Sequence, residues 1–215
     1  MPDEQPVIFI VDDDPSMRAT LSDVMRSVGL AAQTFASAED FLRSKLRDAP
    51  GCLVLDVRLP GQSGLDFQRT LAESGIELPV VFITGHGDVS TSVRAMKAGA
   101  VDFLTKPFRD QDLLDAVRVA IERDRERREH ARRVADLHER SRSLTERERD
   151  IMALVVLGHP NKQVAAALGL GEVTVKADRR HIMRKMGARS LLELARMADR
   201  LGGPAEKNSR RCRTA

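Results

Sequence analysis

Short apolar runs alternate with amphipathic stretches throughout the first 121 residues of the chain. The stretches between these runs repeat apolar residues at the three- and four-residue spacing of a helix. Strands that alternate with helices favour a parallel sheet covered by helices on both faces. We therefore expect a doubly wound α/β domain with a five-stranded parallel sheet over residues 1–121. The predicted strands are VIFIV (7–11), LAAQTF (30–35, the weakest), CLVLDV (52–57), PVVFIT (79–84) and VDFLT (101–105).

Polar side chains gather where these strands end. Asp12, Asp13, Asp56, Thr84 and Lys106 all fall at the carboxyl ends of strands, where parallel sheets bind their ligands. Several carboxylates on one rim bind a hard divalent cation, and Mg²⁺ suits one or two carboxylates together with phosphate and water. A carboxylate beside such a cation can attack phosphorus, while a lysine and a hydroxyl neutralise the phosphoryl oxygens.

Each of these residues also has an ordinary explanation. A strand-end aspartate is more often a cap or turn former than a ligand, and a lone lysine is usually solvated. The third acid of the run, Asp14, is predicted as a solvent-facing turn residue. His86 is predicted as a loop residue, because nothing near it in the sequence would orient it as a base. The convergence of three strand-end acids and a lysine favours a site over these separate explanations.

Four motifs together resemble the receiver domain of bacterial two-component response regulators, over about residues 6–121. They are the acid pair in VDDDP, LVLDVRLPGQSG, FITGHGD and FLTKPF. The resemblance implies that Asp56 is the phospho-acceptor. It also implies that Mg²⁺ (or Mn²⁺) is bound by Asp13, Asp56 and the backbone carbonyl of Arg58, with Asp12 acting through water.

The same resemblance assigns roles to residues around the acceptor. Lys106 would pair with the phosphate, and Thr84 would donate its hydroxyl. Phe103 stands at the aromatic switch position. The family usually has a cis peptide bond between the equivalents of Lys106 and Pro107. Movement of Thr84 and Phe103 would then reshape the face formed by the fourth helix, the fifth strand and the last receiver helix.

Charge is distributed unevenly along the chain. Residues 1–121 hold 12 Lys and Arg against 18 Asp and Glu, whereas residues 143–215 hold 15 against 8. The basic C-terminal part invites a polyanionic partner. Aromatic residues make up only 3% of the chain, with no Trp or Tyr, which argues against a binding mode built on stacked aromatic platforms.

The intervening residues 122–142 are dominated by charge and contain neither Pro nor Gly. They can therefore prolong the preceding helix. Two interpretations remain open for this segment: a solvated helical linker and a short dimerising coiled coil. Its thin apolar stripe consists of Ala131, Val134, Ala135 and Leu137.

Residues 143–201 are predicted as four short helices, with a tight GLG turn at 169–171 before a basic helix. A capped helix, a tight turn and a basic helix are the parts of a helix-turn-helix. The tail, residues 202–215, is predicted to be disordered. Two capping boxes and one single cap mark helix starts in this part. The cap residues are Thr145 with Glu148, Asn161, and Ser190 with Glu193.

A second resemblance, to the LuxR-type DNA-binding domain, covers the run LTERERDIMALVVLGHPNKQVAAALGLGEVTVKADRRHIMRKMGARSLLELA. Combined with the receiver-like half, it makes the chain similar to the NarL/FixJ family. In relatives the matching recognition helix enters the major groove. The resemblance implies base contacts at Lys176, Ala177 and Arg180, with Thr174 and Arg179 nearby, and phosphate contacts at Lys162, Arg184 and Lys185.

Two residues depart from the LuxR-type pattern. Gly171 stands where relatives commonly have a Ser or Thr cap, at a cost of roughly a few tenths of a kcal/mol. Asp178 stands where many relatives have His. Its carboxylate could accept a hydrogen bond from cytosine N4, or it could pair with an Arg on its own helix.

The two resemblances imply a DNA-binding transcription regulator, expected to be an activator, that is switched by phosphorylation on Asp56. The expected partners are a cognate sensor histidine kinase, double-stranded DNA, RNA polymerase and, after phosphorylation, a second copy of the chain. No enzyme activity is expected beyond the receiver's own phosphoryl transfer and dephosphorylation. Two alternatives are a response regulator that acts through protein partners and a Mg²⁺-dependent aspartyl phosphatase.

The sequence also gives an expectation for the compartment. The N-terminal MPDEQP is acidic, and no apolar run approaches the roughly 20 residues that a membrane helix needs. The two cysteines, Cys52 and Cys212, have no metal-ligand spacing and give no disulfide framework. We therefore expect a cytoplasmic protein with no membrane partner.

Overall fold

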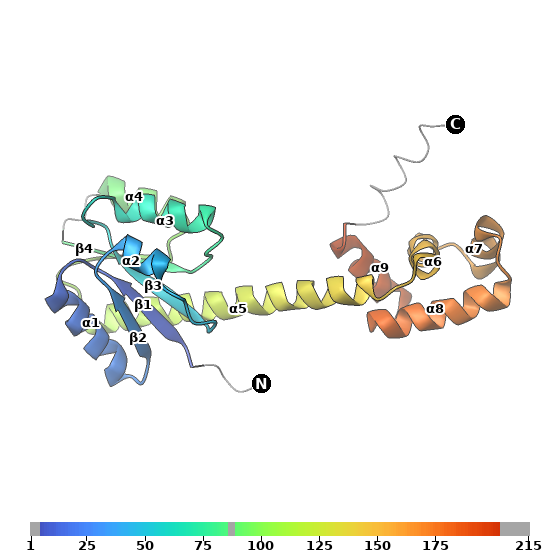
Figure 1. Cartoon of the computed structure of the whole chain (residues 1–215), viewed down its shortest axis with the longest axis horizontal. Coiled ribbons are helices and arrows are strands. Elements are labelled where there is room, and N and C mark those ends of the chain that lie inside the picture. The colour runs from blue at the N-terminus through green and yellow to red at the C-terminus, as the bar shows by residue number, and fades with distance from the viewer. Residues whose placement is uncertain (1–4, 86–88, 203–215) are drawn as a thin grey trace. The chain divides into compact units, whose positions relative to one another are not determined.

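The computed structural model describes residues 5–85 and 89–202 of the chain (Figure 1). The chain divides into two compact units between Glu129 and His130. The first unit is an α/β domain, the second is helical, and each has its own buried core. No helix among the described residues is both long and apolar enough to span a membrane.

The first unit is built on a parallel sheet. Its strands are β1 (Val7–Val11), β2 (Ala31–Phe35), β3 (Gly51–Asp56), β4 (Val80–Thr84) and β5 (Asp102–Thr105), in the spatial order β2-β1-β3-β4-β5. The central strands β1, β3 and β4 are buried along their whole length, as a sheet covered on both faces requires. The edge strand β2 is only partly buried, which explains the weak signal of its sequence. The predicted doubly wound α/β fold is confirmed.

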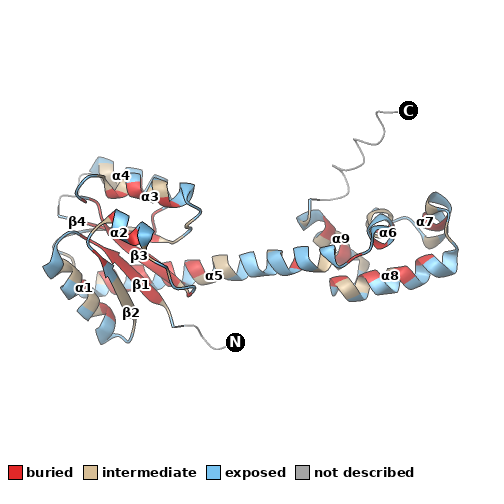
Figure 2. Ribbon diagram, in the orientation of Figure 1, coloured by how far each residue is buried: buried red, intermediate tan, exposed pale blue. Residues whose placement is uncertain are grey.

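Helices cover both faces of this sheet. They are α1 (Pro15–Ser27), α2 (Ala38–Arg43), α3 (Gly64–Glu73), α4 (Val89–Lys97) and α5 (Asp110–Arg142). Because side chains alternate along a strand, β1 feeds two core layers. Phe9 packs with residues of α2 and α3, whereas Ile8 and Ile10 pack with residues of α1 and α5. Figure 2 shows the buried strands enclosed by helices whose outer faces are exposed.

The helix α5 carries a buried carboxylate, Asp124, against the start of β3. The backbone N–H of Gly51 donates to Asp124 Oδ2 at 3.0 Å. Arg127 and Arg128 each donate to the same carboxylate at 2.7 Å. The first turns of the predicted linker, residues 122–142, are therefore fixed to the sheet of the first unit.

The second unit packs the end of α5 with four shorter helices. They are α6 (Glu146–Val156), α7 (Asn161–Leu168), α8 (Glu172–Met186) and α9 (Leu191–Arg200). Apolar residues of all four helices meet in one core, and Leu137 of α5 is buried with them. Leu137 is the largest residue of the apolar stripe predicted in residues 122–142. Because it is buried in this core, it is not available to a coiled coil between two copies. The core includes Ile151, Val155, Val164, Val175, Ile182, Met186 and Leu194.

Two of the helix starts in this unit follow the predicted caps. Thr145 accepts from the Glu148 N–H at 3.2 Å, and the Glu148 carboxylate accepts from the Thr145 N–H at 2.8 Å, so this capping box is confirmed. Ser190 accepts from the Glu193 N–H at 3.2 Å. The return bond differs from the prediction, because Glu193 accepts from the N–H of Arg189 instead.

The predicted cap of α7 is wrong. The N-cap position is taken by Pro160, and Asn161 is the first helical residue. The Asn161 side chain is instead used between helices, because its Oδ1 accepts from Arg179 of α8 at 3.0 Å. The tight turn that follows α7 is confirmed, with Gly169 in the left-handed region at φ 66°. Glycine adopts this backbone conformation without the steric cost that a side chain would bring.

Candidate functional site: an acidic pocket and a basic helix face

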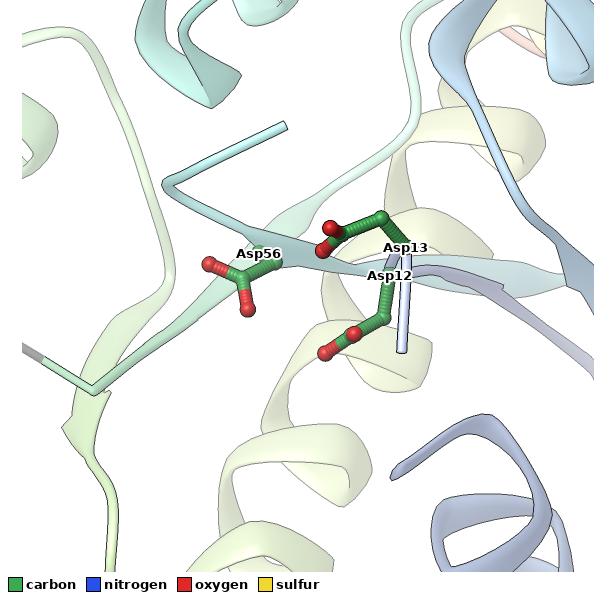
Figure 3. A group of neighbouring side chains, drawn as sticks. All are labelled: Asp12, Asp13 and Asp56. Carbon is green, nitrogen blue, oxygen red and sulfur yellow. The ribbon is translucent and has the colours of Figure 1, made fainter. Parts of the chain in front are cut away.

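Three carboxylates meet at the carboxyl end of the sheet in the first unit. Asp12 directly follows β1, and Asp56 is the last residue of β3. These two strands are paired in parallel with Val11 opposite Leu55, so the next residue of each strand emerges at the same edge. Oxygen atoms of Asp12, Asp13 and Asp56 lie within 4.8 Å of one another (Figure 3). Asp12 is fully buried and Asp56 is 7% exposed, whereas Asp13 faces solvent.

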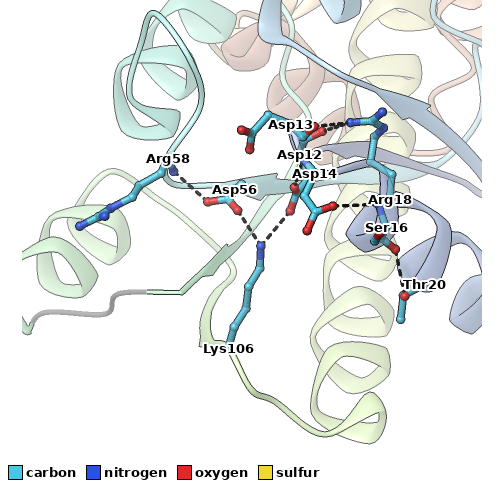
Figure 4. Close-up of polar contacts among 9 residues, drawn as sticks. All are labelled: Asp12, Asp13, Asp14, Ser16, Arg18, Thr20, Asp56, Arg58 and Lys106. Carbon is cyan, nitrogen blue, oxygen red and sulfur yellow. Dashed lines mark hydrogen bonds and ion pairs between the residues drawn. The ribbon is translucent and has the colours of Figure 1, made fainter.

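Hydrogen bonds fix the orientation of the two buried carboxylates. Asp12 Oδ1 accepts from the N–H of Asp14 at 2.9 Å, and Asp56 Oδ1 accepts from the N–H of Arg58 at 2.8 Å. The second oxygen of each carboxylate is bound by Lys106, whose Nζ lies 2.8 Å from Asp12 and 2.6 Å from Asp56 (Figure 4). The predicted convergence of strand-end acids and lysine is therefore present in the structure.

The charges in this pocket do not balance. Burial raises the pKa of Asp12 above its ordinary value, although Lys106 opposes the shift. Burial lowers the pKa of Lys106, but its hydrogen bonds to Asp12 and Asp56 outweigh that effect and leave the pKa raised. Lys106 therefore stays protonated, and one ammonium faces three carboxylates. A divalent cation is the species that would relieve the remaining negative charge.

The turn after β1 is held by the start of α1, through the N-cap residue Asp14 and the side chain of Arg18. Asp14 is exposed and caps α1, because its carboxylate accepts from the N–H of Ser16 at 2.8 Å. Arg18 donates through Nη1 to the backbone carbonyls of Asp12 and Asp13, at 2.7 and 2.9 Å. Sequence analysis missed Arg18. The sequence indicates only that Arg18 lies in the first turns of a helix that directly follows the strand, a spacing that can bring its side chain back to the end of that strand.

A glycine allows α3 to approach the end of β3 closely. A Cβ atom placed on Gly64, the first residue of α3, would lie 2.4 Å from the backbone oxygen of Asp56. No side chain can occupy that position without moving the backbone. Gly64, the second glycine of the PGQSG run, thus keeps α3 against the strand end that carries Asp56. This role was not predicted from the sequence.

The other predicted residues of the first unit lie around the same edge. Thr84 ends β4 and is fully buried, and its backbone oxygen accepts from the N–H of Lys106 at 2.7 Å. Phe103 lies on β5 and is partly buried. The peptide bond between Lys106 and Pro107 is cis, as the resemblance implied. His86 lies outside the described residues.

In the second unit, α8 divides its side chains between core and solvent. Val175, Ile182 and Met186 are buried on one face. The opposite face is exposed and carries most of the positive charge. Of the predicted DNA contacts, the exposed ones are Lys162 on α7 and Thr174, Lys176, Ala177, Arg180 and Arg184 on α8.

Two of the residues predicted as DNA contacts also form contacts within this unit. Arg179 donates to Asn161 of α7. Lys185 Nζ lies 2.6 Å from Glu148 Oε2, which is buried at the start of α6. Burial alone would raise the pKa of Glu148, but hydrogen bonds from Lys185 and from the Thr145 backbone lower it below its ordinary value. Both cations thus hold α8 against its neighbours.

Among the described residues, Asp178 pairs with an arginine of another helix and not with one of its own. It is 6% exposed, and its Oδ2 lies 3.0 Å from Nε of Arg147 on α6. The predicted pairing within α8 is wrong, because Asp178 points into the unit and meets the arginine of a neighbouring helix. The buried carboxylate is held away from the exposed basic face.

Two family models match the chain. The model for the response regulator receiver domain matches residues 8–118, and the model for bacterial regulatory proteins of the luxR family matches residues 142–198. The transcriptional regulatory protein FixJ of Azorhizobium caulinodans is 42% identical over 200 residues, covering 92% of this chain and 93% of that protein. The chain is a two-component response regulator of the NarL/FixJ family.

This response regulator resembles other proteins over most of its length. Nodulation protein W of Bradyrhizobium diazoefficiens is 58% identical over 196 residues, covering 91% of this chain and 86% of that protein. A low-resolution structure of the response regulator StyR is 44% identical, with a TM-score of 0.83, and the match covers 91% of this chain and 98% of that one.

Membership of the family defines the two units in functional terms. The first contains a receiver domain and the second a LuxR-type DNA-binding domain, so the protein regulates transcription within a two-component system. A receiver with a DNA-binding domain implies a cognate kinase and DNA as partners. The three clustered carboxylates are compatible with a divalent metal ion.

Proposed function

We propose that a histidine kinase phosphorylates this response regulator on Asp56 and that the modification activates DNA binding and transcription. The observation that carries the proposal is the placement of the Asp56 carboxylate. Its Oδ2 lies 2.6 Å from Lys106 Nζ, and oxygens of two further acids lie within 4.8 Å. The proposed acceptor, a lysine ammonium and an acid pair compatible with a divalent metal ion therefore share one pocket.

The residues present fit Mg²⁺ or Mn²⁺. Hard cations of this size take oxygen ligands, and the pocket offers carboxylates whose charge exceeds that of Lys106. Asp13, Asp56 and the backbone carbonyl of Arg58 would hold the ion, with Asp12 acting through water. When bound, the ion neutralises negative charge on the phosphoryl oxygens.

The transfer forms a P–O bond to the Asp56 carboxylate and breaks the P–N bond to the kinase histidine. Lys106 is charged and already bonded to Asp56, so its ammonium can follow the negative charge onto a phosphoryl oxygen. The Thr84 hydroxyl would donate to another phosphoryl oxygen. Attack of water on phosphorus in the same pocket would break the P–O bond to Asp56, release inorganic phosphate and restore the carboxylate, which limits the lifetime of the signal.

The added charge would be transmitted through β4 and β5. Thr84 and Lys106 are linked by a backbone hydrogen bond, so movement toward the phosphoryl group displaces both strand ends together. Phe103 stands on the neighbouring strand and is only partly buried, which leaves it free to change its packing. The displacement reaches α4, β5 and α5, the surface that we propose pairs with a second receiver.

The exposed side of α4 and α5 supports this choice of dimer surface. Val89, Val93 and Met96 recur at helical spacing on α4 and are 80%, 44% and 47% exposed, and Val119 on α5 is 50% exposed. The three residues of α4 recur on one exposed helix face, and such an apolar face favours an interaction site. A dimer presents two DNA-binding domains, and the second half-site then binds at a raised effective concentration.

We propose that α8 is the recognition helix and enters the major groove. Lys176, Ala177 and Arg180 would contact base edges, with Thr174 nearby, because all four lie on its exposed side. Lys162 and Arg184 are exposed cations that suit phosphate contacts. Arg179 and Lys185 would act by holding the helix. The bound dimer would then recruit RNA polymerase as an activator.

Beryllofluoride, which stands in for the phosphoryl group, tests this function. The full-length protein is titrated onto a duplex selected from a random pool, with and without beryllofluoride and Mg²⁺. We expect tighter binding and a shift from monomer to dimer in sedimentation. Asp56→Asn should lose both responses, because the acceptor carboxylate is gone.

A second aspartate provides the matched control. Asp66 is an exposed acid on α3 that pairs with Arg69 at the surface, at 3.1 Å. Asp66→Asn should respond to beryllofluoride as the wild-type protein does. If the wild-type protein gained neither dimerisation nor DNA affinity, the proposed switch would be wrong.

A further inference from the structure

The exposed face of α8 contains an apolar side chain that the fold does not use. Val173 is the second residue of the helix and is 84% exposed, more than any other large hydrophobic side chain among the described residues. It belongs to none of the buried clusters of the described chain. A β-branched residue also favours a helix less than Ala or Lys would. Neither packing nor helix propensity therefore explains Val173.

Val173 lies on the same side of α8 as the basic residues. Positions 176, 177, 180 and 184 follow it by three, four, seven and eleven residues, the spacing of one helical face. All of these side chains are exposed, and the core residues of α8 lie on the other side. Val173 and Ala177 thus form a small apolar strip flanked by Lys176, Arg180 and Arg184.

This combination fits one group in double-stranded DNA. The cations attract the phosphate backbone, and the N-terminal residues of a recognition helix are those that reach base edges. Within the major groove, the C5-methyl group of thymine is the apolar feature that distinguishes one base pair from the others. A second copy of the chain is a poorer partner for this face, because its own cations would repel the same face of that copy.

We propose that Val173 contacts the C5-methyl group of a thymine in each half-site and so makes the protein select thymine at that position. The inference rests on the proposed function, in which α8 enters the major groove. It adds a base contact that the family resemblance did not assign. Val173 has no hydrogen-bonding group in its side chain, so its contribution is to sequence selectivity through shape and apolar contact alone.

The experiment replaces thymine by deoxyuridine, which removes only the methyl group. Each thymine of a selected operator is changed in turn, in both half-sites, and bound by the beryllofluoride-treated full-length protein. At one position, the change from thymine to deoxyuridine is expected to weaken binding by the wild-type protein by about fourfold per half-site. This is the effect of burying one methyl-sized group. The Val173→Ala protein should show no loss at that position, so the two changes are coupled in a double-mutant cycle.

Leu157 supplies the matched control. It is a 63% exposed apolar residue at the end of α6, outside the basic face. Leu157→Ala should keep the wild-type response to deoxyuridine at every position. Because alanine favours helix, Val173→Ala is expected to keep the wild-type circular dichroism spectrum.

Three results would overturn the inference. If the duplex is bound but no thymine position is coupled to Val173, the contact is absent while the proposed DNA binding stands. If Val173→Ala weakens all duplexes equally, or changes sedimentation without DNA, the residue acts on packing or on a second copy. If no duplex is bound at all, the proposed function and this inference both fail.

Discussion

Replacing Asp124 with Asn should destabilise the receiver unit, although the residue lies far from Asp56 in sequence and carries no predicted function. Its carboxylate is fully buried and accepts hydrogen bonds from Arg127, Arg128 and the backbone of Gly51. The amide of Asn keeps the approximate size but removes the charge, and in either orientation its NH₂ group would face a guanidinium group, that of Arg127 or that of Arg128. The substitution thus opposes donors to donors in a buried position.

The magnitude follows from the exposure of the two arginines. Breaking a fully buried ion pair costs roughly 3–5 kcal/mol. The Arg127 and Arg128 side chains remain 36% and 18% exposed, and they keep ion pairs with Glu77 and Asp48. Part of their charge can therefore be solvated. We expect Asp124→Asn to lower the free energy of unfolding by about 2–3 kcal/mol. For a unit of this size that corresponds to roughly 6–12 °C in Tm.

Far-UV circular dichroism suits the measurement, because the chain contains neither Trp nor Tyr for fluorescence. Hydrogen exchange adds a local test, since the Gly51 N–H should lose protection in Asp124→Asn. Asp115→Asn is the control: Asp115 also lies on α5 but forms an exposed ion pair with Arg118 at 3.4 Å, so its loss should cost under about 0.5 kcal/mol. A thermal transition of Asp124→Asn equal to that of the wild type, with Gly51 still protected, would refute the reasoning.

Three further predictions concern the acidic pocket and the DNA-binding unit. Lys106→Met should tighten Mn²⁺ binding, measured by electron paramagnetic resonance, because the ammonium that competes for Asp12 and Asp56 is removed; it should also slow phosphorylation, and unchanged Mn²⁺ affinity would contradict this account. Arg18→Ala should weaken Mn²⁺ binding in the same assay, because the backbone after β1 loses both of the hydrogen bonds that Arg18 donates. Folding lowers the pKa of Glu148 below its ordinary value of 4.5. The carboxylate therefore contributes its full stabilisation when the pH is above 4.5, and this contribution is lost as the pH falls through the folded-state pKa. Acid titration followed by circular dichroism should show Glu148→Gln less stable than the wild type at neutral pH, with the difference shrinking below about pH 4.5; a constant difference would be contrary to this.

The sheet and the pocket could be predicted because their signals are local and strong. The fully buried strands β1, β3 and β4 consist of continuous apolar runs. Once these strands are parallel, their carboxyl ends must meet at one edge, which brings Asp12 and Asp56 together without further information. The cis bond before Pro107 came from the family resemblance and not from the physical pattern.

The features that sequence analysis missed depend on contacts between distant residues. Asp124 lies in a run of charges that indicates a solvated helix, yet it binds a backbone group 73 positions earlier in the chain. A charge run does not reveal which of its members faces a neighbouring element. Asn161 looked like a helix cap because its residue type favours caps, but its side chain binds Arg179, and the cap position falls to Pro160.

Intact-mass spectrometry tests whether Asp56 carries the phosphoryl group. The wild-type protein and Asp56→Asn are incubated with acetyl phosphate and Mg²⁺ under identical conditions. We expect the wild-type protein to gain the mass of one phosphoryl group on the peptide that contains Asp56, and we expect Asp56→Asn to gain nothing. A wild-type protein of unchanged mass, or an Asp56→Asn protein that gains the same mass, would contradict it.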